Sequence, residues 1–252
     1  MKNTNYIYGV NPVTEAIKSE KVEIEKIFVA FGLESLYQKI YKQSKSKKIP
    51  CVLLDKKKFS KIEKEEFGLG VKTQGVMALT RPFKLYSIVE LIEKTKNITN
   101  PIFVALDEIS DPHNFGAIAR SAECSGCSGV IITERNSAPI TPTAIKISAG
   151  ALEHIPVAKV TNLQQSLKVL KDNGFWIIGT DADAERVYTD EIYNSPIVIV
   201  IGSEGKGMRL ILKKDCDFLV KIPLKGKVTS LNASVSAAVI LFEIQRQRSL
   251  IK

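Results

Sequence analysis

Few sequence patterns limit the choice of fold as strongly as a strand-length segment made up wholly of apolar residues. The clearest example here is residues 196–201, "PIVIVI", in which no polar residue marks a solvent-facing side. A strand that is apolar on both faces has to be buried on both faces, as in a parallel sheet covered by helices on either side. Strands of this sheet are expected at Ile102–Leu106, Gly129–Thr133, Phe175–Thr180, Ile197–Ile201 and Phe218–Ile222. Helical patterns lie between most of them, so the chain is predicted to contain an α/β parallel-sheet domain.

The first third of the chain alternates helix and strand on a smaller scale, which predicts a small α/β layer domain. Helices are expected at Asn11–Ser19, Ser35–Ser44 and Lys57–Glu66, and strands at Ile24–Ala30, residues 50–54 ("PCVLL") and residues 74–80 ("QGVMALT"). The Pro-containing stretch "TRPFKLY" is typical of a linker, and a helix at Ser87–Thr95 is expected to open the larger domain. We therefore predict a small domain at residues 1–79, a linker at 80–86 and the parallel-sheet domain at 87–252.

Positive charge is concentrated in the small domain. The chain has a formal net charge of +9; residues 1–86 hold 17 Lys and Arg against 9 Asp and Glu, whereas residues 87–252 hold 19 against 18. A basic module joined to a near-neutral one indicates an anionic partner. A merely solubilising surface is the alternative explanation of these lysines.

Composition also bears on the cellular compartment. No apolar core follows the lysine of residues 1–20, so no signal peptide is expected. No apolar run approaches the roughly 18 residues of a membrane span. The pair Cys124 and Cys127, "CSGC", lacks a second ligand pair at zinc spacing and follows a helix instead of starting one. We expect buried or inert thiols, no metal and a cytoplasmic protein.

The first of three segments that indicate function is residues 103–123, "FVALDEISDPHNFGAIARSAE". Asp111 or Asn114 can cap a helix whose first turn tolerates Pro112. The residues expected on its buried stripe are Phe115, Ile118, Ala119 and Ala122.

His113, Gly116 and Arg120 are predicted on a different face of that helix. Gly116 costs roughly 0.5–1 kcal/mol of helix stability relative to Ala, so a close approach by another element is expected there. An arginine over a glycine, near the free N–H groups of a helix start, can hold a phosphate. An exposed arginine beside a packing glycine is the alternative.

The second segment is residues 196–208, "PIVIVIGSEGKGM". It is not a Walker loop, because Gly207 follows Lys206 where Ser or Thr is required, and its glycine spacing does not match a Rossmann fingerprint. What remains is exposed backbone at the carboxyl end of a parallel strand, where α/β folds bind ligands, with Glu204 held among glycines. A simple turn is the alternative.

The third segment is residues 220–248, "VKIPLKGKVTSLNASVSAAVILFEIQRQR". A strand ends at Ile222, and Ser230 or Asn232 caps a helix. One apolar stripe is expected to hold Leu231, Val235, Ala238 and Phe242. Ile240 and Leu241 lie on other faces, so the helix is predicted to be buried on two sides, as at a subunit interface. Packing within one domain explains the pattern equally well.

Together, the three segments resemble the motifs of the SpoU/TrmH family of RNA ribose 2′-O-methyltransferases, in the SPOUT superfamily. "DEISDPHNFGAIARSAE", "VIGSEGKGM" and "IPLKGKVTSLNASVSAA" are similar to its three motifs, in their order, and "KISAGALEHIPV" between them is also family-like. The basic N-terminus, with "YGVNPVTEAI" and "TQGVMAL", resembles the substrate-binding domain of the RlmB-like branch, which is similar to a ribosomal-protein fold. Thr73 departs from the histidine that relatives commonly carry before Gln-Gly.

This resemblance implies a trefoil knot in the C-terminal domain, with S-adenosylmethionine bound in the knot, and a homodimer with the active site near its interface. The residues implied to bind the cofactor are Thr180, Gly202, Ile222 and Leu231. Those implied to surround the reacting ribose are Asn114, Arg120, Glu204, Ser230 and Asn232. A guanidinium holds its proton tightly, so we expect Arg120 to clamp phosphate and ribose; the role of the base is the alternative.

The implied reaction is S-adenosylmethionine-dependent 2′-O-methylation of a ribose in structured RNA. A guanosine of large-subunit (23S-type) rRNA is the expected target, because the separate N-terminal domain resembles that of the RlmB-like branch. A tRNA ribose methyltransferase is one alternative. A non-catalytic RNA-binding or ribosome-assembly protein of the same fold is the other.

Overall fold

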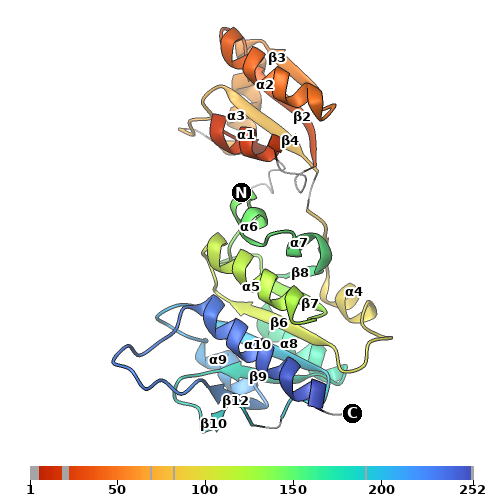
Figure 1. The fold of residues 1–252 in the computed structure, drawn as a ribbon, viewed down its shortest axis with the longest axis vertical. Coiled ribbons are helices and arrows are strands. Elements are labelled where there is room, and N and C mark those ends of the chain that lie inside the picture. The colour runs from red at the N-terminus through yellow and green to blue at the C-terminus, as the bar shows by residue number, and fades with distance from the viewer. Residues whose placement is uncertain (1–5, 19–22, 69, 82, 191, 251–252) are drawn as a thin grey trace. The chain divides into compact units, whose positions relative to one another are not determined.

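The computed structural model describes residues 6–18, 23–68, 70–81, 83–190 and 192–250. The chain divides into two compact units, Met1–Phe83 and Lys84–Lys252, and Figure 1 labels most of their elements. The division falls inside the stretch predicted as a linker. Within the described ranges, no helix is both long and apolar enough to cross a lipid bilayer.

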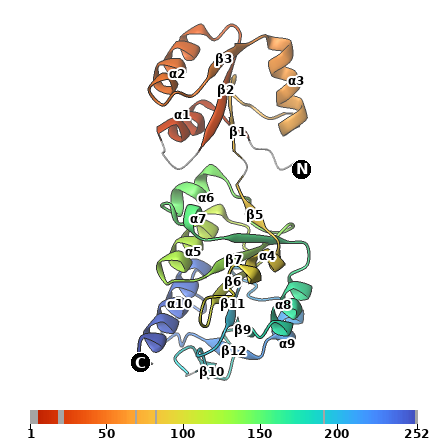
Figure 2. The same cartoon turned by 90° about the vertical axis from the view of Figure 1, so that its right-hand side faces the viewer.

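The first unit is a four-stranded sheet with helices on both faces. Its strands are β1 (Tyr6–Tyr8), β2 (Ile24–Ala30), β3 (Cys51–Leu54) and β4 (Val76–Thr80), and its helices are α1 (Val10–Lys18), α2 (Glu34–Ser46) and α3 (Lys56–Phe67). The strand order is β1-β4-β2-β3, with β2 parallel to β3 and antiparallel to β4. Helices α1 and α2 cover the face that contains Ile27, and α3 covers the other face through Phe59 (Figure 2). All predicted helices and strands of this unit are present, and β1 is additional; Ser19, the predicted end of the first helix, lies outside the described residues.

The second unit contains a wholly parallel eight-stranded sheet, so the predicted fold class is confirmed. Its strands are β5 (Leu85–Tyr86), β6 (Ile102–Asp107), β7 (Gly129–Thr133), β8 (Val157–Val160), β9 (Trp176–Thr180), β10 (Arg186–Val187), β11 (Ile197–Gly202) and β12 (Phe218–Lys221). The order is β10-β12-β9-β11-β6-β7-β8-β5, and every neighbouring pair is parallel. The apolar strand β11 lies at the centre, where residues 197–201 are at most 1% exposed.

Helices cover both faces of this sheet (Figure 2). They are α4 (Ile88–Glu93), α5 (Pro112–Cys124), α6 (Pro142–Ile147), α7 (Ala151–His154), α8 (Leu163–Asp172), α9 (Leu210–Asp215) and α10 (Ala233–Leu250). Leu91 of α4, Leu167 of α8 and Leu212 of α9 share one buried cluster with the sheet. On the opposite face α5 packs against α10, and α6 and α7 pack against α5.

The predicted linker at 80–86 is only partly a connection. Thr80 is the last residue of β4, and Leu85–Tyr86 forms β5, which pairs in parallel with β8. β5, β8 and β10 are absent from the predicted set. They have two to four residues each, so they carry too little periodicity to be recognised.

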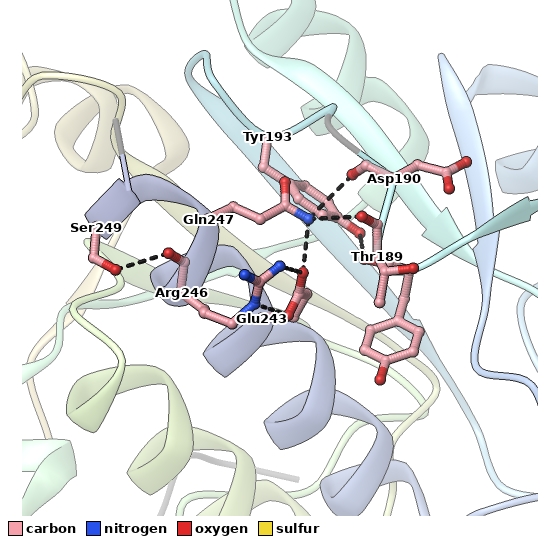
Figure 3. A network of polar contacts seen from close by, with 8 residues as sticks. Thr189, Asp190, Tyr193, Glu243, Arg246, Gln247 and Ser249 are labelled. Carbon is pink, nitrogen blue, oxygen red and sulfur yellow. Dashed lines mark hydrogen bonds and ion pairs between the residues drawn. The ribbon is translucent and has the colours of Figure 1, made fainter. Parts of the chain in front are cut away.

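The end of α10 is attached to the segment between β10 and β11 (Figure 3). Gln247 donates from Nε2 to the carbonyls of Thr189 (3.0 Å) and Asp190 (3.3 Å). Arg248 donates to the carbonyls of Tyr193 (2.9 Å), Ser195 (2.6 Å) and Asn100. Since most of these acceptors are loop carbonyls without a sheet partner, the helix end satisfies backbone groups that the loop cannot satisfy itself.

The same network gives α10 a pH-sensitive ion pair. Arg246 donates two hydrogen bonds to Glu243, at 2.7 and 2.8 Å, and Gln247 adds a third (Figure 3). The Arg246 bond, followed by that of Gln247, lowers the pKa of Glu243 from 4.5 to about 2, against the opposing effect of burial. A carboxyl whose pKa falls on folding adds stability above its ordinary pKa and loses it as pH decreases.

We therefore expect Glu243→Gln to lower the free energy of unfolding at pH 6 and to have a smaller effect as the pH approaches 2. Urea unfolding of both proteins between pH 6 and pH 3 measures this difference. A difference that stays constant over that range would contradict the ion pair as its cause.

Candidate active site

Three of the four predicted cofactor-binding residues lie at the carboxyl ends of adjacent strands. Thr180 ends β9, Gly202 ends β11 and Ile222 directly follows β12, and these strands are neighbours in the order β12-β9-β11. Carboxyl ends of parallel strands are where α/β folds bind ligands. Leu231, the fourth residue, lies in the loop before α10 and is 37% exposed.

The loop after β11 folds back over Gly202. Ser203 and Gly207 exchange backbone hydrogen bonds of 3.2 and 2.9 Å, which closes a tight turn. A Cβ on Gly202 would lie 2.3 Å from the carbonyl carbon of Gly207 and 2.3 Å from the nitrogen of Met208. Such distances are too short for any side chain, so only glycine allows the backbone of this loop to approach the strand end.

Three polar residues from the three motifs meet in one hydrogen-bonded cluster. Asn114, on the first turn of α5, donates from Nδ2 to Oε1 of Glu204 at 2.9 Å. Asn232 donates from Nδ2 to Oδ1 of Asn114 at 3.0 Å and also to Oε1 of Glu204. These hydrogen bonds join residues that are 28 and 118 positions apart in the sequence, at the edge of the sheet where β6 and β11 end. We call Asn114, Glu204 and Asn232 the amide–carboxylate cluster.

The cluster is positioned by helix starts. Asp111 caps α5 by accepting from the backbone N–H of His113 at 2.9 Å, so Asp111, of the two predicted candidates, is the cap and Asn114 is left for the cluster. Asn232 caps α10, since its Oδ1 accepts from the N–H groups of Ser234 (2.9 Å) and Val235 (3.4 Å). The side chain of Asn232 thus both caps α10 and holds Glu204 in position.

Arg120 and Ser230 are not part of the cluster. Both are exposed, Arg120 on α5 and Ser230 in the loop before α10. Arg120 follows Asn114 by six positions, so their side chains leave the helix about 120° apart. The close approach predicted at Gly116, on the same face of α5 as Arg120, is confirmed. A Cβ added to Gly116 would lie 2.6 Å from the carbonyl oxygen of Ala144 in α6.

An additional ion pair connects two of the motifs. Asp107, at the end of β6, is fully buried and accepts from the Arg209 backbone N–H (2.8 Å) and from its Nε (2.7 Å). This contact fixes the end of the glycine-rich loop to the first motif. The signal that could have revealed it is a carboxylate directly after a strand of apolar residues, because a buried charge requires a partner.

The four cysteines are free thiols. Burial raises the pKa of Cys127 to about 11, so its thiol stays protonated at neutral pH. Cys124 is exposed. Across the described ranges, no group of three His, Cys, Asp or Glu side chains is placed to hold a metal ion.

Two family models match the chain. Residues 101–242 match the SpoU rRNA Methylase family. Residues 6–86 match the model for RNA 2′-O ribose methyltransferase substrate binding. The first match covers the strand ends, the folded-back loop and the amide–carboxylate cluster.

Curated relatives are similar over almost the whole chain. A TrmH family tRNA/rRNA methyltransferase of Bacillus subtilis, YacO, is 38% identical over 247 residues, which is 97% of this chain and 96% of that protein. A TrmH family tRNA/rRNA methyltransferase of Staphylococcus epidermidis is 40% identical over 244 residues, covering 96% and 95%.

Solved structures share the fold. The SpoU methyltransferase AviRb from Streptomyces viridochromogenes, in complex with AdoMet, aligns with a TM-score of 0.66 at 20% identity, over 97% of this chain and 90% of that one. The A. aeolicus TrmH/SpoU tRNA modifying enzyme aligns with a TM-score of 0.56 at 30% identity, over 65% and 83%.

A strand-end site of this construction, joined to a substrate-binding domain, defines an RNA 2′-O-ribose methyltransferase. The chain belongs to the SpoU rRNA methylase family, and its relatives are tRNA/rRNA methyltransferases of the TrmH type. The resemblance expected from the three motifs is thereby confirmed at the level of the family.

Proposed function

We propose that this enzyme methylates the ribose 2′-oxygen of a guanosine in large-subunit (23S-type) rRNA, as in the RlmB-like branch, and acts in the cytoplasm. The observation that carries the proposal is the amide–carboxylate cluster, in which all three motifs meet beside the strand ends. The substrate-binding domain at residues 6–86 and the basic excess of the first third support a structured RNA as substrate.

S-adenosylmethionine, when bound, supplies an electrophilic methyl group on a sulfonium. We assign its binding to Thr180, Gly202, Ile222 and Leu231. The fit rests on Gly202, where the folded-back loop brings backbone groups of Gly207 and Met208 to the end of β11 without an intervening side chain. The AdoMet complex of AviRb, a protein of the same fold, is consistent with this assignment.

Glu204 has the role of orienting the ribose. Its Oε1 accepts from the amides of Asn114 and Asn232, which fixes the carboxylate. Its Oε2 has no hydrogen-bond partner among the described residues, so it can accept a hydrogen bond from a ribose hydroxyl. Correct alignment of reactants contributes about 7–11 kcal/mol in favourable cases, and this cluster is built to provide it.

Arg120 and Ser230 complete the site from exposed positions. Arg120 clamps a phosphate and the ribose and stabilises the oxygen that loses its proton, because a guanidinium offers several donors in a rigid plane. Its side chain leaves α5 about 120° away from Asn114. This difference in direction favours a site shared between subunits, and we propose that Arg120 of one protomer serves the pocket of its partner.

This arrangement requires a homodimer. The apolar side chains Leu231, Val235 and Phe242 are 37%, 46% and 46% exposed, whereas Ala237, Ile240 and Leu241 on the other side of α10 are buried. The stripe predicted from the sequence is thus the outward one, and a second subunit covers it. We further propose that the C-terminal part is knotted as a trefoil, as in the SPOUT superfamily; insertion of β11 between β6 and β9 fits that topology.

Labelled methyl transfer to purified rRNA and tRNA, followed by mapping of the modified ribose, tests the proposal. Label on one guanosine ribose of large-subunit rRNA is the expected result. Label on tRNA alone would favour the alternative suggested by the 30% identity with the A. aeolicus tRNA modifying enzyme. Failure to bind S-adenosylmethionine in a direct titration would leave only a non-catalytic RNA-binding protein.

Asn232→Ala is expected to lower turnover about 10- to 100-fold, since loss of both hydrogen bonds frees Glu204 from its position. It should also destabilise α10 by about 1 kcal/mol through loss of the N-cap. Asn232→Asp separates the two effects, because aspartate keeps the cap but cannot donate to Glu204. Full turnover in the aspartate variant would remove Asn232 from the site.

RNA binding should weaken steeply with salt. A domain that binds through phosphates releases counterions, so the logarithm of the affinity falls linearly with the logarithm of the salt concentration. Fluorescence anisotropy with an rRNA fragment between 50 and 300 mM KCl, about a sixfold range, measures the slope. An affinity independent of salt would exclude phosphate docking.

A further inference from the structure

A cleft lies at the carboxyl ends of β6, β7 and β8, on the other side of β6 from the assigned cofactor-binding residues. It has a volume of about 260 Å³ and is formed where β6, β7 and β8 end and α9 begins. Its polar lining consists mainly of Glu108, Thr133, Arg135, Asn136, Gln164 and Arg209. The cofactor-binding residues assigned above belong to β9, β11 and β12, so this β6–β8 cleft is a separate feature of the same sheet edge.

Two of its residues have strained backbones. Glu108 has φ +57° and Asn136 has φ +55°, and Asn136 donates from Nδ2 to Oε1 of Glu108 at 3.3 Å. Left-handed conformations are costly for side chains such as glutamate and are concentrated at functional sites. The hydrogen bond from Asn136 holds the carboxylate of Glu108 at the wall of the cleft.

Two guanidinium groups accompany this carboxylate. Arg209 uses Nε for its ion pair with Asp107, and its two terminal nitrogens have no hydrogen-bond partner within the described ranges. The guanidinium of Arg135 also has no partner there, while its carbonyl accepts from Oγ1 of Thr133 at 2.7 Å, which fixes the backbone. Arginines with unoccupied donors are suited to phosphate.

The mixture of groups identifies the ligand class. A free phosphate would be repelled by Glu108, whereas a nucleotide has both a phosphate for a guanidinium and a base edge for a carboxylate. A carboxylate only accepts hydrogen bonds, and among the four bases only guanine presents two adjacent N–H donors, N1–H and N2–H, on its Watson–Crick edge. Leu163 and Leu212 add apolar wall against which a base can pack.

We propose that the β6–β8 cleft binds one guanosine nucleotide of the RNA substrate, with its base on Glu108 and its phosphate on Arg135 and Arg209. The proposal rests on the RNA methyltransferase function given above and adds a subsite that reads sequence. The cleft volume of about 260 Å³ lies just under the roughly 300–1,000 Å³ of small-ligand sites, so the cleft has room for no more than one nucleotide.

The first test is independent of methyl transfer. Calorimetry of the full-length protein with guanosine 5′-monophosphate and adenosine 5′-monophosphate should show about tenfold tighter binding of the guanosine nucleotide, the discrimination expected of one bidentate contact. Glu108→Gln should abolish this preference. The matched control is Glu134→Gln, an exposed carboxylate nearby that does not line the cleft, and it should behave as the natural protein. Equal binding of the two nucleotides by the natural protein would overturn the proposal.

The second test uses RNA. Inosine lacks the 2-amino group, so transcripts with scattered inosine substitutions should bind the natural protein poorly when one particular guanosine is replaced. That interference should vanish in Glu108→Gln, and Arg135→Ala should raise the KM for the RNA about tenfold without changing S-adenosylmethionine affinity. Interference that persists in Glu108→Gln would show that another site reads the guanosine. If the natural protein shows no methyl transfer, the proposed enzymatic function is refuted. The preference for the guanosine nucleotide would still decide whether the β6–β8 cleft binds guanosine.

Discussion

Arg120→Ala is expected to reduce methyl transfer by about 10²- to 10⁴-fold, the usual contribution of one group that handles charge or a proton in the transition state. Binding of S-adenosylmethionine should stay unchanged, because none of the assigned cofactor residues lies on α5. Single-turnover methylation of rRNA and calorimetry with the cofactor measure the two quantities separately. The exposed residue Cys124, one turn further along the same helix, gives a matched control as Cys124→Ser.

Arg120→Lys distinguishes a clamp from a base. Lysine keeps the charge but offers no planar fork, so a clamp loses most of its activity at every pH. A base would instead leave a lysine variant whose activity rises as the ammonium loses its proton at high pH. Near-normal turnover of Arg120→Ala would end the assignment of this residue to the site.

Mixed dimers formed from Arg120→Ala and Asn232→Ala subunits test whether Arg120 serves the partner's pocket. If it does, the mixture would regain up to about one quarter of the activity of the natural dimer.

Arg209→Ala should destabilise the second unit by about 3 kcal/mol, the lower end of the range for removing one partner of a buried ion pair. The variant leaves the carboxylate of Asp107 fully buried with a single backbone donor. The side chain of Arg209 is 44% exposed, which is why the lower end of the range applies. Urea unfolding provides the measurement, with the exposed Arg186→Ala as control.

Adding Asp107→Asn to Arg209→Ala should restore part of the lost stability. An asparagine removes the unpaired charge and can still accept the backbone N–H of residue 209. A double variant less stable than Arg209→Ala would mean that the packing of Arg209, and not the buried charge, causes the loss.

The predicted helices and strands agree with the structure where the chain repeats a pattern over several residues. Ile24–Ala30 and Gly129–Thr133 have the predicted bounds, and β11 differs by one residue. The two-residue strands β5 and β10 have no such pattern, because they exist only through pairing with β8 and β12. Their strand conformation is imposed by the sheet.

The candidate active site likewise contains some residues that the sequence predicted and others that it did not. The motifs placed Asn114, Glu204 and Asn232 in one constellation, and the structure joins them by hydrogen bonds. It leaves Arg120 and Ser230 exposed on this chain, and it adds Asp107 with Arg209. The apolar strand before Asp107 signals that this carboxylate needs a partner. It does not identify the partner, since Arg209 lies 102 positions away and comes close only when β11 lies beside β6.

By itself, the sequence determined the α/β class, the parallel sheet, the helix caps among a few candidates and the family. The family was indicated by the resemblance of three motifs, and the other features depend on burial, periodicity and backbone hydrogen bonding within short segments. The tertiary structure alone decided which face of α10 is buried, which residues share the strand-end edge and where the β6–β8 cleft lies. Such features depend on the order of strands in the sheet, which brings distant segments together and leaves no trace in any one of them.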